Sequence, residues 1–139
     1  RAMDWIETPA KIAQKLEVPT GTRLLRIERI RLGDGVPIGL QTSFLALANG
    51  QEISEAELQA GGSLYRILQE KFNIIPSEAD ETLEVTLATP EEAELLQVVE
   101  GAPLLLSERV LFAQDRRPVE YVKILYRGDR YQYYVRLTR

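Results

Sequence analysis

Two arginines and one glutamate lie on predicted strand faces that are otherwise apolar. Side chains alternate between the two faces of a strand, so Arg29 and Arg31 share a face with Leu25 and Ile27. Glu120 shares its face with three large side chains, Val122, Ile124 and Tyr126. Arginine recognises carboxylate and phosphate groups through paired hydrogen bonds, so the two arginines are suited to binding an anion.

Three explanations account for charged residues on these apolar faces, and the residues alone do not decide among them. The strand ends are exposed and the charges are solvated, or an arginine and Glu120 form an internal ion pair, or a polar cavity holds a charged ligand. A charge in any of these places needs water or a partner, because an isolated buried ion is costly. A candidate helix start at Gly61-Gly62-Ser63 favours the cavity, since free N–H groups at a helix N-terminus bind anions. On the next strand, Gly39 and Gln41 are small or polar enough to leave space for that ligand.

The composition leaves little catalytic chemistry. The chain has no cysteine and no histidine, which excludes a thiolate nucleophile, a disulfide framework and the serine–histidine–aspartate triad. Glu120 is able to act as an acid or base and Ser63 as a nucleophile, but Ser63 has no histidine to activate it. We therefore expect no metal or cofactor, and an enzyme only for chemistry that needs positioning and electrostatics alone.

The length and composition are those of one ordinary globular domain. The chain has 139 residues, of which 45% are hydrophobic and 27% are charged. The formal net charge is −4, so this chain by itself is a poor candidate for binding nucleic acid through phosphate neutralisation. No apolar run approaches the length of a membrane helix and no signal peptide is evident, so we expect a cytoplasmic protein.

An internal repeat at an offset of 80 residues organises the chain. The repeated residues are Ala13, Leu16, Val18, Gly21, Leu24, Leu25, Glu28 and Arg29, which recur as Ala93, Leu96, Val98, Gly101, Leu104, Leu105, Glu108 and Arg109. We interpret the repeat as a duplicated unit of helix, glycine turn, strand, turn and strand. Its helices are predicted at 9–16 and 90–97 and its strands at 22–33, 36–46, 102–113 and 118–127. Thr8 and Thr89 are the predicted N-caps, and Glu92 completes a capping box with Thr89.

The remaining segments complete the predicted domain. Two helical pieces are predicted between the copies, near 54–60 and 63–72, and a strand follows near 80–88 with Leu83, Val85 and Leu87 facing inward. A last hairpin is predicted to lead into a strand at 131–138. Hairpins with inserted helices predict an α+β fold, a mostly antiparallel β-sheet with helices packed on it.

Six short motifs follow one another along nearly the whole chain. They are Arg-x-Arg (29–31), Asp-Gly-x-Pro-Ile (34–38), Gly-Ser-Leu-Tyr (62–65), Gly-x-Pro-Leu-Leu (101–105), Pro-Val-Glu (118–120) and Tyr-Arg-Gly-Asp-Arg-Tyr (126–131). In this order and spacing they resemble the UTRA domain, the effector-binding half of HutC-subfamily GntR-type bacterial transcription regulators. The family's fold is similar to that of chorismate lyase, in agreement with the predicted class.

The resemblance implies a ligand-sensing domain rather than an enzyme. Residues 8–139 would form the effector-binding domain, and residues 1–7 would be linker or vector-derived residues. Members are typically homodimers in which a small metabolite modulates DNA binding by an N-terminal winged helix-turn-helix. We expect that helix-turn-helix to be absent from this chain, so that operator DNA is a partner of the parent protein only.

The resemblance also implies ligand-binding residues. In members that sense amino-sugar phosphates, the matching motif positions hold the phosphate, which gives Arg29, Arg31, Ser63 and Tyr65 here. The matching positions that contact the rest of the ligand are Glu120 and Tyr126. Those sensors tend to carry a glutamate where this chain has Gln41, which weakens the case for an amino sugar in particular.

The ligand implied is therefore a small anionic metabolite, a sugar phosphate or a carboxylate. The alternative is a small lyase-type enzyme of the same fold, in which the arginine pair holds a carboxylate substrate. A third reading is a dimerisation module with a collapsed cavity and no ligand.

Overall fold

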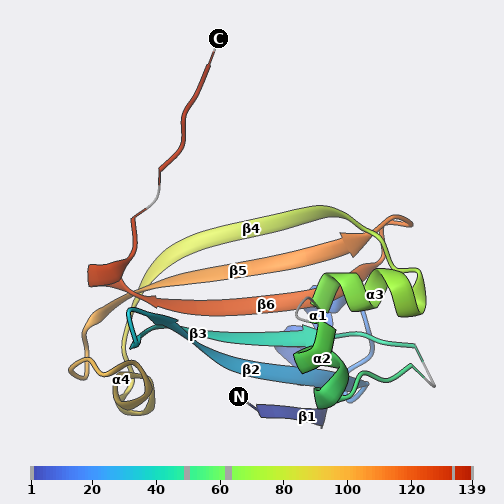
Figure 1. Cartoon of the computed structure of the whole chain (residues 1–139), viewed down its shortest axis with the longest axis horizontal. Helices are drawn as coiled ribbons and strands as arrows, with labels where there is room; N and C mark the ends of the chain where they lie inside the picture. Colours follow the sequence, from blue (N-terminus) through green and yellow to red (C-terminus); the bar gives the residue numbers. More distant parts are fainter. Residues whose placement is uncertain (1, 49–50, 62–63, 133, 139) are drawn as a thin grey trace.

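One antiparallel sheet forms the centre of the molecule. The computed structural model describes residues 2–48, 51–61, 64–132 and 134–138. Within these ranges six strands follow the order β1-β2-β3-β6-β5-β4 across the sheet (Figure 1). The strands are β1 (Ala2–Glu7), β2 (Arg23–Gly33), β3 (Val36–Leu45), β4 (Pro76–Leu87), β5 (Pro103–Ala113) and β6 (Pro118–Arg127). The helices are α1 (Ala10–Leu16), α2 (Glu55–Gly61), α3 (Leu64–Phe72) and α4 (Pro90–Leu96), and a short 3₁₀ turn, η1, spans Gly128–Arg130.

The duplication predicted from the sequence is present in the structure. Two hairpins, β2–β3 and β5–β6, meet at the centre of the sheet, where β3 pairs with β6. The helix before each hairpin ends in the same way, since Glu17 after α1 and Gln97 after α4 both adopt the left-handed conformation, with φ of 56° and 57°. The helices and strands of both copies therefore match the predicted ranges to within one or two residues.

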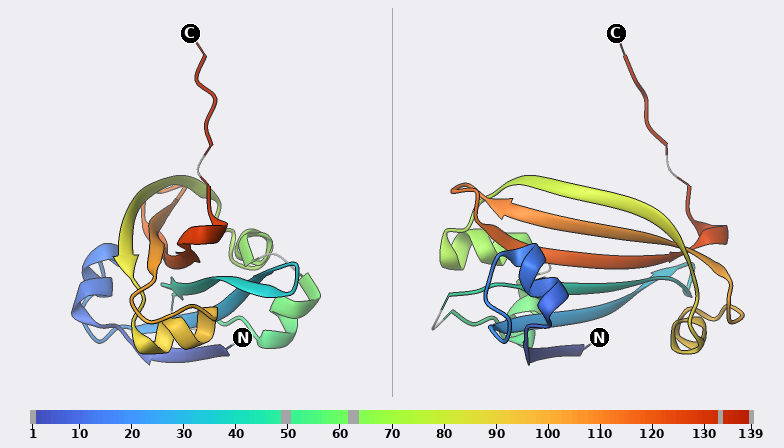
Figure 2. Two further views of the ribbon diagram at one scale, coloured as in Figure 1. Left: turned by 90° about the vertical axis from the view of Figure 1, so that its left-hand side faces the viewer. Right: turned by 180° about the vertical axis from the view of Figure 1, so that it is seen from behind.

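The helices are divided between the two faces of the sheet (Figure 2). The helices α1 and α4 pack on one face, where Leu16 of α1 belongs to a buried cluster with Phe44 and Tyr121, and Leu96 of α4 belongs to a buried cluster with Leu40. The inserted helices α2 and α3 pack on the other face and cover one end of it, with Leu68 buried against the sheet. In the part of the chain that the structure describes, no α-helix covers the other end of that second face (Figure 2).

One of the two predicted N-caps is confirmed and the other is wrong. Thr89 accepts a hydrogen bond from the Glu92 backbone N–H and the Glu92 carboxylate accepts one from the Thr89 N–H, so the predicted capping box is confirmed. The prediction for Thr8 is wrong, because Pro9 is the N-cap of α1 and makes no side-chain cap. The buried Thr8 hydroxyl instead donates to the carbonyl oxygen of Thr22, which lies on the loop leading into β2.

The prediction that the apolar side chains of the strand near 80–88 face inward is also wrong. This strand, β4, is an edge strand of the sheet, and among the described residues it pairs with β5 alone. Leu83, Val85 and Leu87 are therefore 40%, 71% and 63% exposed.

The predicted last strand does not form over the described residues 131, 132 and 134–138. A hairpin partner of β6 has no free position, because β3 and β5 already occupy both sides of that strand.

The N-terminal segment corrects a further expectation. The sequence predicts linker over residues 1–7, but residues 2–7 pair with β2 as the opposite edge strand, β1. Met3 and Trp5 pack against the core under α2 and α3, and the Arg23 guanidinium lies 4.2 Å from the Trp5 ring centroid. Apolar packing at alternate positions therefore makes this segment part of the sheet.

Thr89→Ala is expected to lower the free energy of unfolding by about 1 kcal/mol, because it removes an N-cap acceptor from α4. Urea unfolding measures this difference. Thr20→Ala, in the exposed turn before β2, is the matched control and should leave stability nearly unchanged. Equal stability of the Thr89 variant and the control would contradict a stabilising role for the cap.

Candidate functional site

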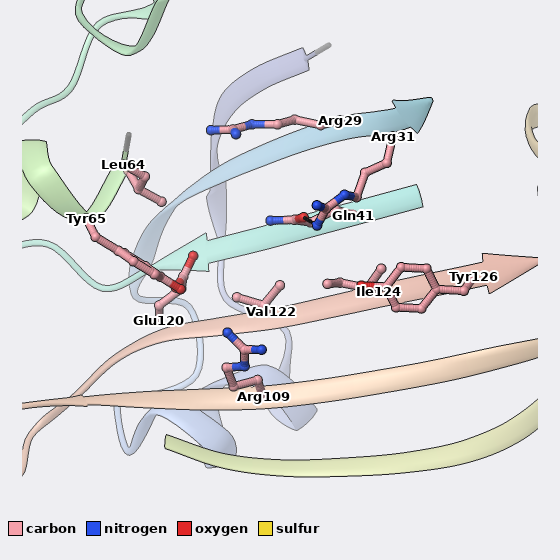
Figure 3. Close-up of a pocket in the computed structure, with 10 residues that line it drawn as sticks. All are labelled: Arg29, Arg31, Gln41, Leu64, Tyr65, Arg109, Glu120, Val122, Ile124 and Tyr126. Carbon is pink, nitrogen blue, oxygen red and sulfur yellow. Dashed lines mark hydrogen bonds between the residues drawn. The ribbon is translucent and has the colours of Figure 1, made fainter. Parts of the chain in front are cut away.

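A cavity of about 330 Å³ lies where α3 meets the uncovered part of the sheet (Figure 3). Four central strands and the first turn of α3 contribute its walls. The lining residues are Arg29, Arg31, Gln41, Leu64, Tyr65, Arg109, Glu120, Val122, Ile124 and Tyr126. The alternation along each strand brings these side chains to one face, since Gln41 lies beside Arg29 and Ile124 in the register.

Three arginines make the cavity basic. Arg29 and Arg31 extend from β2, and Arg109 extends from β5 on the far side of β3 and β6 (Figure 3). The Nη1 of Arg31 donates to Oε1 of Gln41 at 3.1 Å, which holds that guanidinium over the sheet. Since Gln41 is neutral, this contact orients Arg31 without cancelling its charge. The cavity therefore presents cationic groups from two opposite sides.

A buried carboxylate forms the base of the cavity. Glu120 is 1% exposed, and its Oε1 accepts a hydrogen bond from the Tyr65 hydroxyl at 3.0 Å. Burial raises the pKa of Glu120, although the hydrogen bonds from Tyr65 and Ser43 and the charges of Arg109 and Arg29 oppose that rise. Burial and the neighbouring carboxylate raise the pKa of Tyr65 to about 12, so its hydroxyl remains a donor at neutral pH. The Tyr65–Glu120 bond thus joins α3 to the central strand.

Arg109 is held from behind by a second carboxylate. Its Nη2 lies 3.4 Å from Oε2 of Glu81 on β4, and the same oxygen accepts a hydrogen bond from Ser107 at 3.0 Å. Burial lowers the pKa of Arg109, but the charge and hydrogen bond of Glu81 act in the opposite direction and the pKa is raised overall, so the guanidinium stays charged. Arg109 is thereby fixed with its charge toward the cavity and Glu120 (Figure 3).

Gly39 provides the space for an aromatic wall. A Cβ atom on Gly39 would lie 3.3 Å from Cδ1 of Tyr126, the residue opposite it on β6. The Tyr126 ring also packs on Tyr131, with the ring centroids 4.7 Å apart. The absence of a side chain at Gly39 therefore lets Tyr126 lie flat against the sheet at one end of the cavity.

The structure brings six of the residues proposed from the sequence to this one cavity: Arg29, Arg31, Gln41, Tyr65, Glu120 and Tyr126. The seventh, Ser63, lies outside the described residues. Sequence reasoning missed Arg109, although the repeat contained the signal, since Arg109 is the copy of Arg29. It also missed Leu64, which follows the proposed helix start.

The arrangement is suited to binding and offers little for covalent chemistry. Among the described residues, no cluster of three acidic side chains is placed to hold a metal ion. No helix in the described ranges has the length and apolar character needed to cross a membrane. A basic cavity with a carboxylate at its base, built on a β-sheet, has the features of a small-molecule binding site.

The comparisons with known proteins agree with that class. The family model of the UTRA domain matches residues 2–132, and the chain belongs to this family. Its fold is accordingly the α+β, chorismate lyase-like fold of GntR-type ligand-binding domains.

Two repressors illustrate the relationship. The HTH-type transcriptional repressor NagR of Bacillus subtilis is 33% identical over 129 residues, which is 92% of this chain and 52% of that protein. The HTH-type transcriptional repressor PhnF of Mycolicibacterium smegmatis is 32% identical over 86% of this chain and 48% of its own length. The chain thus spans about half the length of these relatives.

Solved structures show the same fold. A ligand-binding domain assigned to a GntR-family transcriptional regulator from Bordetella bronchiseptica superposes with a TM-score of 0.88 at 29% identity, covering 99% of this chain and 86% of that one. PhnF from Mycobacterium smegmatis superposes with a TM-score of 0.79 at 27% identity, covering 99% of this chain and 60% of that one.

Glu120→Gln is expected to stabilise the domain at neutral pH. Burial raises the pKa of Glu120 in the folded state, so the folded protein holds this proton more tightly than the unfolded chain does. The wild type therefore loses stability as the pH rises from the ordinary carboxyl pKa to the higher pKa of the folded state. Glutamine keeps an acceptor for Tyr65 and has no charge to bury. The melting temperature measured between pH 3.5 and 8 should therefore be higher for the variant at the alkaline end only. A variant that is less stable than the wild type at pH 8 would contradict the assignment.

Proposed function

We propose that this chain is the effector-sensing domain of a bacterial GntR-type transcription regulator that acts in the cytoplasm as a homodimer. Its ligand is a small anionic metabolite, a sugar phosphate or a carboxylate, bound in the cavity between α3 and the sheet. DNA binding belongs to a winged helix-turn-helix of the parent protein. The repressor names of the relatives favour this role over a lyase-type enzyme of the same fold.

The charge balance of the cavity carries the proposal. Three guanidinium groups face one carboxylate whose pKa is raised by burial, so the cavity has an excess of positive charge even when Glu120 is ionised. Glu81 engages Arg109 from outside the cavity. Arg29 and Arg31 are then the groups placed to bind the anionic part of a ligand, through the bidentate geometry that arginine favours.

The opposite end of the cavity suits the uncharged part of the ligand. Glu120 supplies a carboxylate acceptor at the base, and the Tyr65 oxygen, whose hydrogen is donated to Glu120, supplies a second acceptor, which fits hydroxyl or amide N–H groups. The Tyr126 ring supplies a flat apolar wall of the kind on which a sugar ring packs. These contacts would select among metabolites that share the same anionic group.

Ligand binding would control DNA binding through a shift in populations. A ligand changes the equilibrium between two conformations only to the extent that it binds one of them more tightly. The hydrogen bond from Tyr65 to Glu120 ties α3 to the sheet at the cavity itself, so a ligand that engages Glu120 competes with a contact between these elements.

Arg31→Ala is expected to weaken ligand binding by roughly 1.5–3 kcal/mol, the scale of a charge-assisted hydrogen bond. A thermal-shift screen of sugar phosphates, amino-sugar phosphates and small carboxylates first identifies the probe, and calorimetry then measures its affinity. The matched control is Arg26→Ala, which removes the same charge from the opposite face of β2, where Arg26 pairs with Asp4 at 2.9 Å. Equal losses in the two variants would show a non-specific charge effect and refute the site.

Gln41→Glu is expected to reduce the affinity for a purely anionic probe by roughly tenfold, or about 1.4 kcal/mol. The new carboxylate would pair with Arg31, whose Nη1 already contacts this side chain, and would cancel part of the charge that binds the anion. Calorimetry with the wild-type probe measures the loss. The same variant should lose less affinity for an amino-sugar phosphate, because its ammonium group gains a partner.

A further inference from the structure

A second cavity of about 330 Å³ lies between α1 and the sheet, on the face opposite the first cavity. Figure 2 shows α1 lying against that face. Along β6 the two cavities take alternate side chains, since Glu120 and Val122 line the first and Tyr121 and Lys123 line the second. The sheet therefore separates the two cavities. The second is called the α1 cavity below.

The inner wall of the α1 cavity is apolar and aromatic. Phe44 of β3 and Tyr121 of β6 stack there with their ring centroids 5.9 Å apart, and Ile12 and Leu106 also line the cavity. The Tyr121 hydroxyl donates to the Glu108 carboxylate, so the polar atom of this wall already has a partner. A wall of rings and aliphatic groups suits the apolar body of a ligand, such as a phenyl ring.

Lysines gather around the α1 cavity. The chain has four lysines, and three of them line this cavity: Lys11 and Lys15 of α1 and Lys123 of β6. No salt bridge between described residues includes any of these three. Glu84 and Glu108 are the carboxylates in the lining, so positive charge is in excess by one. This balance favours a ligand with a single negative charge.

The stability of α1 does not explain the lysines. At the repeat offset of 80 residues, Lys11 and Lys15 correspond to Glu91 and Leu95 of α4, so the shared arrangement of helix and hairpin does not require them. The helix dipole favours a cation in the last turn, which accounts for Lys15. It disfavours a cation in the first turn, where Lys11 lies, and does not act on Lys123 of β6.

We propose that the α1 cavity binds a small monocarboxylate with an apolar or aromatic body, as a second ligand site distinct from the sensing cavity. The carboxylate lies among the lysine ammonium groups, and the body packs against Phe44 and Tyr121. A volume of about 330 Å³ is near the lower limit of ligand pockets, which span about 300–1,000 Å³, so the ligand is small. This inference does not rest on the proposed function.

Hydrocinnamate, a phenyl ring on a short carboxylate chain, is the probe, and calorimetry on the whole chain measures its affinity. We expect the uncharged amide of the same shape to bind at least tenfold more weakly. Lys123→Gln and the double variant Lys11→Gln/Lys15→Gln should each weaken hydrocinnamate binding about tenfold, the scale of a charge-assisted hydrogen bond. Since Lys11 and Lys15 are exposed, the double variant should retain the circular dichroism of the wild type. Lys71→Gln, which removes the fourth lysine from its pair with Glu57, is the matched control and should leave the affinity unchanged.

Protection from acetylation locates the bound probe. An acetylating reagent modifies the lysines, and mass spectrometry measures the rate at each one. We expect hydrocinnamate to slow the modification of Lys11, Lys15 and Lys123, and to leave the rate at Lys71 unchanged.

Several results would overturn the inference: no binding of hydrocinnamate, equal affinity for its amide, equal losses in the Lys71→Gln control, or equal protection of Lys71. Binding that disappears in Arg31→Ala would also overturn it, because the probe would then lie in the first cavity. Binding of the anionic probe of the first cavity is measured separately on the lysine variants. Failure of the α1 cavity and failure of the sensing function are therefore distinguishable.

Discussion

Glu120 lies on the central strand β6 and is almost completely buried. Its carboxylate accepts a hydrogen bond from the hydroxyl of Tyr65 on α3. A buried carboxylate is costly unless donors and cations surround it. The groups that meet this requirement, Tyr65, Ser43, Arg29 and Arg109, come from four different elements. Satisfying one buried charge thus fixes α3 against the sheet and gathers the arginines around a single cavity. The cavity is a consequence of that requirement.

The duplicated unit explains why arginines lie on two opposite sides of the cavity, and the inserted helices explain why only one end of this sheet face is covered. Each copy supplies a hairpin and an arginine at the same point, Arg29 on β2 and Arg109 on β5. The inserted helices α2 and α3 break the symmetry, since they cover one end of one sheet face only. Arg109 is then engaged by Glu81 on the neighbouring strand β4, whereas the residue paired with Arg29 on the neighbouring strand β3 is the neutral Gln41. The two copies share the same arrangement of helix and hairpin, but their equivalent arginines have different neighbours.

One aromatic pair connects the cavity to the residues that follow η1. Tyr126 lines the cavity and packs on Tyr131, the first residue after η1. The same segment has no place beside β6, because β3 and β5 occupy both sides of that strand. Among the described residues, strand order thus makes β4 an edge of the sheet and leaves the residues after η1 no position beside β6.

The sequence by itself determined most of the helices and strands and most of the residues that line the cavity. Periodicity and the repeat located both hairpins and their helices, the Thr89 capping box, and the faces of Arg29, Arg31 and Glu120, because these properties depend on neighbours within a few residues. The features that depend on the order of strands in the sheet were decided only by the tertiary structure. Placing β6 at the centre excluded a last hairpin, and placing β4 at the edge exposed Leu83, Val85 and Leu87. Strand order also brought Arg109 opposite Arg29, since alternation shows which face a side chain takes but not which strands lie next to one another.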